Sequence, residues 1–103
     1  MTVEIYRDNN PASARSLRVS IYNGTITMVE QDYGELVRKM FGDSDIERFL
    51  SSISADEVKK ALMVSSDEQL EEALKTSFGS NDGFDRFAAF LKSHNIGFRS
   101  GSY

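Results

Sequence analysis

The chain of 103 residues contains no cysteine, one histidine and one proline. Without cysteine it cannot form a disulfide framework or a thiolate metal site. A single histidine, His94, excludes a metal cluster built from several imidazoles. One proline and seven glycines leave no material for a Pro-rich or Gly-rich linker.

Long apolar runs are also missing from the sequence. No stretch approaches the ~20 apolar residues needed to cross a bilayer. Residues 1–15 carry an acid and lack the apolar core of a signal peptide. Together with the missing cysteines, these features lead us to expect a cytoplasmic protein without a membrane partner.

Composition indicates a folded chain. Hydrophobic residues make up 40% of it and include seven phenylalanines and four tyrosines, far more than a disordered chain carries. A chain of this length fits one domain with a modest core. We therefore expect a single domain over residues 1–103.

Negative charge is concentrated in the middle of the chain. Residues 43–72 hold nine acids against three bases, although the whole chain has a net charge of only −4. An acidic surface repels phosphate, so we expect no direct contact with nucleic acid.

Alternating apolar residues predict strands. Leu17, Val19 and Ile21 precede Asn23–Gly24, and apolar residues alternate again after this pair. Asn-Gly suits a two-residue turn with positive φ, so residues 16–31 are predicted to form a β-hairpin. Residues 2–6 and 96–100 are predicted to add strands.

Helical spacing and capping residues mark the remaining elements. Helices are predicted over 32–42 with Asp32 as N-cap, after Ser54, after Ser65, and over about 84–94. Residues 45–53 fit both a strand and a helix. The sequence thus predicts an α+β fold, with an antiparallel sheet packed against three to five short helices.

The segment GDSDIERF places acids at alternate positions, Asp43, Asp45 and Glu47. A calcium loop starting at Asp43 would need glycine at its sixth place and glutamate at its twelfth, which are Arg48 and Ser54 here. A pair of catalytic carboxylates needs burial to raise the pKa of one member, whereas the glycine and serine beside Asp43 and Asp45 favour an exposed connection in which both acids are solvated. We therefore expect neither a calcium loop nor a catalytic pair in this segment.

Other catalytic signatures are absent as well. The sequence has no G-x-S-x-G, no G-x-G-x-x-G and no P-loop pattern. His94 lies in the last turn of a predicted helix, where an imidazolium interacts favourably with the helix dipole, and this explains the residue without a catalytic role. We therefore expect no enzyme activity, no cofactor and no metal.

Residues 31–62, QDYGELVRKMFGDSDIERFLSSISADEVKKAL, resemble a pattern of small bacterial proteins in which a hairpin leads to Q-D-x-G, a helix, G-D-S-D, a strand and a capped helix. In size, acidity and expected location the chain is also similar to bacterial immunity proteins. That resemblance implies a protein that inhibits a cognate toxin, often a basic nuclease.

An acidic inhibitor would be steered to the basic active site of a nuclease and pair with its cations. The residues predicted to dock are the acids of 43–47 and those of the helix after Ser65: Asp43, Asp45, Glu47, Asp67, Glu68, Glu71 and Glu72. The alternative is a non-catalytic adaptor or subunit that binds another cytoplasmic protein, or a second copy of itself, through the same acids.

Overall fold

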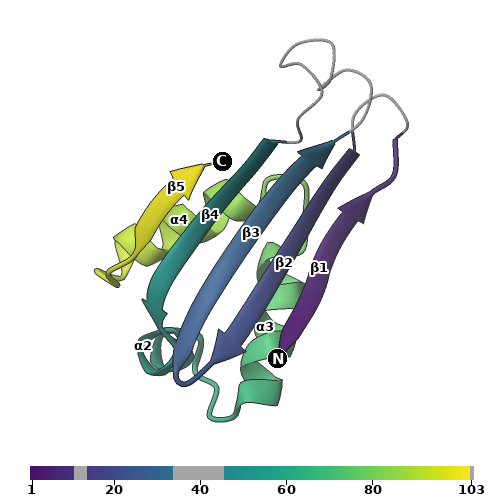
Figure 1. Cartoon of the computed structure of the whole chain (residues 1–103). Coiled ribbons are helices and arrows are strands. Elements are labelled where there is room, and N and C mark those ends of the chain that lie inside the picture. The colour runs from purple at the N-terminus through teal and green to yellow at the C-terminus, as the bar shows by residue number, and fades with distance from the viewer. Residues whose placement is uncertain (11–13, 34–45, 103) are drawn as a thin grey trace.

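The computed structural model of the chain describes residues 1–10, 14–33 and 46–102. Within these ranges the elements follow the order β1 (Thr2–Asp8), β2 (Ala14–Tyr22), β3 (Thr25–Tyr33), β4 (Ile46–Ser54), α2 (Ala55–Leu62), α3 (Asp67–Phe78), α4 (Gly83–Ser93) and β5 (Arg99–Ser102). The strands form one antiparallel sheet in the order β1-β2-β3-β4-β5. Figure 1 shows the three described helices against one face of this sheet; no described helix covers the other, which we call the open face.

The predicted α+β class with an antiparallel sheet is confirmed. The described residues hold three helices, the lower end of the expected range. Most of the predicted helix 32–42 lies outside the described residues. Its proposed N-cap is wrong, because Asp32 lies in β3 opposite Arg15 of β2, and the two side chains form an ion pair of 2.7 Å.

The predicted hairpin is confirmed, and its strands are longer than expected. Tyr22 pairs with Thr25 across the turn. The turn residues Asn23 and Gly24 have φ angles of 51° and 73°, as a two-residue type I′ turn requires. The backbone preferences of two residues therefore set the register between β2 and β3.

The described part of segment 45–53, which fitted both a strand and a helix, lies in strand β4 (Ile46–Ser54). Met28 of β3 lies opposite Leu50, but Ile26 lies opposite Ile53, so β4 carries one extra residue at this point. Ser52 takes the left-handed conformation, with φ 58°. This bulge lets Leu50 and Ile53 both point into the core although they are three residues apart, which is the spacing of a helical face.

Two helices begin at serine caps, one of them displaced from its predicted position. The backbone N–H of Glu57 donates to the Ser54 hydroxyl at the start of α2, as predicted. At the start of α3 the cap is Ser66, which accepts from the backbone N–H of Gln69 at 3.1 Å. Ser65 instead donates its backbone N–H to the Gln69 side chain at 2.8 Å.

The core fills the space between the sheet and the helices. Phe87 of α4 is fully buried, and its ring centroid lies 5.0 Å from that of Phe78. Phe84 of the same helix is buried as well, so α4 contributes two aromatic rings to the core. Residues 94–98 connect α4 to the last strand, which begins at Arg99 rather than at the predicted Ile96.

Candidate functional site

Four of the predicted docking acids lie together on α3, and we call them the α3 acidic surface (Asp67, Glu68, Glu71 and Glu72). The opposite side of α3 carries Leu70, Leu74 and Phe78, which are buried against the sheet and α4. Glu68 and Glu72 are exposed, and Glu71 is half-buried. The amphipathic pattern of the helix thus directs its carboxylates away from the core.

One ion pair among the described residues involves this surface. The Lys59 ammonium of α2 lies 2.7 Å from an oxygen of Asp67, whose side chain is 52% exposed. This contact raises the pKa of Lys59 above its usual value, because the ammonium donates a hydrogen bond to the carboxylate. The charge of Asp67 is therefore partly neutralised within the protein.

Helix stability does not account for every acid of the α3 acidic surface. Asp67 and Glu68 lie in the first turn of α3, where negative charge interacts favourably with the helix dipole. Glu72 lies beyond that turn and follows Glu68 by four residues, a like-charge spacing that destabilises an isolated helix by about 0.2–0.5 kcal/mol. Lys75, four residues after Glu71, offsets only part of this repulsion.

The first group of predicted docking acids is placed differently. Asp43 and Asp45 lie outside the described residues. Glu47 lies on β4 opposite Gln31 of β3 and is half-buried. Since its neighbour Arg48 contacts Phe84 on the helix-covered face, Glu47 points to the open face. The sheet therefore separates Glu47 from the α3 acidic surface.

A buried ionic group that we did not predict joins three strands. Glu30 of β3 is 2% exposed, and one of its oxygens accepts hydrogen bonds of 2.9 and 2.7 Å from Arg48 of β4. Its other oxygen lies 3.5 Å from Arg15 of β2 and accepts no hydrogen bond from the described residues. The sequence contained one sign of this burial: Glu30 occupies the next alternate position after Ile26 and Met28, which both point into the core.

Arg15 and Arg48 extend this group to the helical layer. Arg15 donates two hydrogen bonds to Asp32, which raise the pKa of its guanidinium, and a third to the backbone oxygen of Asn81. Arg48 also lies 3.3 Å from Asp85 of α4. Both cations are thus engaged by acids of this chain, and the group links the sheet to the region where α4 begins.

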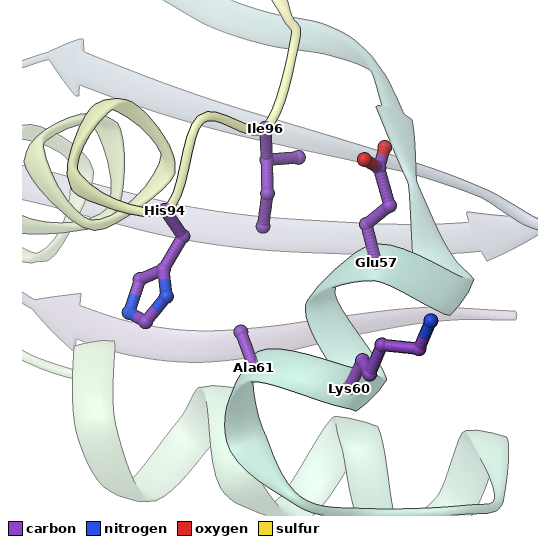
Figure 2. Close-up of a pocket in the computed structure, with 5 residues that line it drawn as sticks. All are labelled: Glu57, Lys60, Ala61, His94 and Ile96. Atoms are coloured by element: carbon purple, nitrogen blue, oxygen red, sulfur yellow. The ribbon is translucent and has the colours of Figure 1, made fainter.

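The surroundings of His94 do not form an acid–base pair. A concave surface of about 310 Å³ is lined by Glu57, Lys60, Ala61, His94 and Ile96. Figure 2 shows the charged ends of Glu57 and Lys60 pointing away from the imidazole. The ring of His94 instead contacts Phe90, with centroids 4.5 Å apart. Among the described residues no carboxylate forms a hydrogen bond or ion pair with the imidazole that would orient it.

Neither a metal site nor a membrane-spanning helix is present in the described residues. Within residues 1–10, 14–33 and 46–102 no three histidine, aspartate or glutamate side chains are grouped so that they could hold a metal ion. In the same ranges, no helix has the length and apolar character needed to cross a bilayer. No protein-family model matches this chain, and neither a curated protein nor a solved structure is significantly similar to it.

Proposed function

We propose that this chain is an immunity protein, a non-catalytic protein that binds a cognate bacterial toxin and blocks its active site. The partner is a basic toxin, with a nuclease as the best candidate because a site that binds phosphate carries positive charge. The observation that supports the proposal most is the α3 acidic surface. Its carboxylates lie on one helix, and of these four acids only Asp67 forms an ion pair with another described residue.

The arrangement on a helix matters for binding. Side chains three and four residues apart on a helix are neighbours, so Glu68, Glu71 and Glu72 present negative charge over a small area of surface. Such a field speeds the encounter with a positively charged partner and orients it. The local repulsion between Glu68 and Glu72 would be relieved by the cations of that partner.

Of the predicted docking acids at 43–47, only Glu47 lies within the described residues, and it is on the other face of the sheet from this surface. If Asp43, Asp45 and Glu47 also contact the toxin, Glu47 must do so from the open face of the sheet. We therefore base the proposal on α3 alone, and the variant Glu47→Gln tests the second area separately.

The experiment first identifies the partner by co-purification from the native host. The decisive variant replaces both Glu68 and Glu72 by glutamine. This change removes the like-charge pair together with the interaction of Glu68 with the helix dipole, and because these two effects oppose each other the melting temperature should change little. Association with the toxin should become slower and less dependent on salt. Cells that produce the toxin should no longer be protected.

The matched control is Asp56→Asn combined with Glu57→Gln, which removes the same charge from exposed positions of α2. It should bind the toxin nearly as fast as the original chain. If the Glu68/Glu72 variant binds equally fast at low salt and protects cells, the proposal for α3 is wrong. If the captured partner is a protein of the host's own metabolism, the adaptor alternative replaces the immunity function.

A further inference from the structure

The edge of the sheet at β5 is open to another strand. β5 pairs with β4 along one side, over Arg48–Ser51, and Figure 1 shows none of the described helices or strands beyond its other side. In an edge strand about half of the backbone N–H and C=O groups point outward. The exposure of Ser100 and Ser102 leaves this side accessible.

The two edges of the sheet differ in how they are protected. β1 has a bulge between Glu4 and Tyr6, and Glu4 forms an ion pair with Arg7, so charge and irregular geometry both oppose pairing. β5 reads Arg-Ser-Gly-Ser and contains neither a bulge nor a proline. With four residues, however, β5 offers few main-chain hydrogen bonds, and a bound strand needs additional contacts.

A groove beside β5 can supply those contacts. It has a volume of about 320 Å³ and lies between the β4–β5 pair and α4, with Phe84, Ala88 and Phe98 among its walls. Ser100 and Ser102 pair with Leu50 and Arg48, whose side chains face the helices, and therefore line the groove. Because serine side chains are short, the groove stays open at the strand edge.

Charge indicates which segment would fit. The groove is lined by two cations and, among the described residues, by no acid. The charge of Arg48 is already matched by Glu30 and Asp85. Lys92, in the last turn of α4, is exposed and forms no ion pair with the described residues. Its ammonium is available for a carboxylate from outside.

We infer that β5 and this groove bind an extended segment of a partner protein, which adds to the sheet as an outer strand. Alternate side chains of a strand point to the same face, so every second residue of the segment enters the groove, and these residues are apolar. An aspartate or glutamate next to them pairs with Lys92. This site is on a different element from the α3 acidic surface, and it stands whether or not the partner is a toxin.

Short random peptides displayed on phage and selected on the full chain test this inference. We expect the selected peptides to share apolar residues at alternate positions, flanked by an acid. In solution a selected peptide should slow hydrogen exchange at the amides of β5, which a contact with side chains alone would not do. A selection without this pattern, or bound peptide without protection of β5, would overturn the inference.

Variants locate the binding. Ser100→Trp fills the groove and should abolish peptide binding, and Lys92→Glu should weaken it at least about tenfold. The control Ser51→Trp adds the same side chain to β4 on the open face, opposite Arg99, and should bind like the original. Equal binding by Ser100→Trp would place the site elsewhere. A chain that dimerises, with Ser100→Trp monomeric, would show that a second copy occupies the edge instead.

Discussion

Glu30 and Arg48 lie opposite each other on β3 and β4, and two hydrogen bonds of 2.9 and 2.7 Å join the guanidinium to one carboxylate oxygen. Glu30 is 2% exposed, whereas Arg48 is 37% exposed. A carboxylate buried to this degree is strongly destabilising without a partner. Arg48, together with Arg15 at 3.5 Å from the other oxygen, supplies the positive charge that offsets the burial of the Glu30 side chain.

Replacing Arg48 by methionine should lower the free energy of unfolding by about 3 kcal/mol, the lower end of the cost of breaking a buried pair, because Arg48 is itself partly solvated. The double variant with Glu30→Leu should recover much of that loss, since no buried charge is left alone. Urea unfolding of the original chain, both single variants and the double variant gives the coupling free energy between Glu30 and Arg48. Strictly additive effects would show that the two side chains do not stabilise each other.

The second prediction concerns the backbone of the turn at Asn23–Gly24. Gly24 has φ 73°, where a β-branched residue is strained, so Gly24→Val should destabilise the protein by about 1–3 kcal/mol. The cause is conformational rather than steric, because no atom lies within 4 Å of a Cβ at this position.

Gly97→Val is the matched control for this measurement. An added Cβ at Gly97 also meets no atom within 4 Å, and its φ is not in the left-handed region. Thermal unfolding should show a lower melting temperature for Gly24→Val than for Gly97→Val. Equal values would mean that the hairpin tolerates a different turn.

The start of α3 provides a third prediction. Ser66→Ala removes the acceptor for the Gln69 backbone N–H and should destabilise the protein by about 0.5–2 kcal/mol. Ser65→Ala removes only an exposed hydrogen bond between side chains and should have a smaller effect. Chemical unfolding of both variants shows which serine is the N-cap. A larger loss in the free energy of unfolding for Ser65→Ala would support the cap expected from the sequence.

Much of the fold could be predicted because neighbouring residues determine it. Asn23 and Gly24 carry the turn in their own backbone preferences, and Ser54 caps α2 through a residue three positions away. The predicted cap of α3 was wrong by one residue. Ser65 and Ser66 are each followed three residues later by a Glu or Gln that suits a capping box, so the local spacing could not show which serine is the N-cap.

The sequence by itself determined the α+β class, the hairpin and the inward faces of the helices, because periodicity and capping act within a few residues. The tertiary structure decided what depends on strand register. The bulge at Ser52 gives β4 a helix-like spacing, Glu30 meets Arg48 only when β3 and β4 align, and Glu47 lies across the sheet from the α3 acidic surface. These relationships join residues that are distant in the chain, and their energies arise only when the sheet closes over its core.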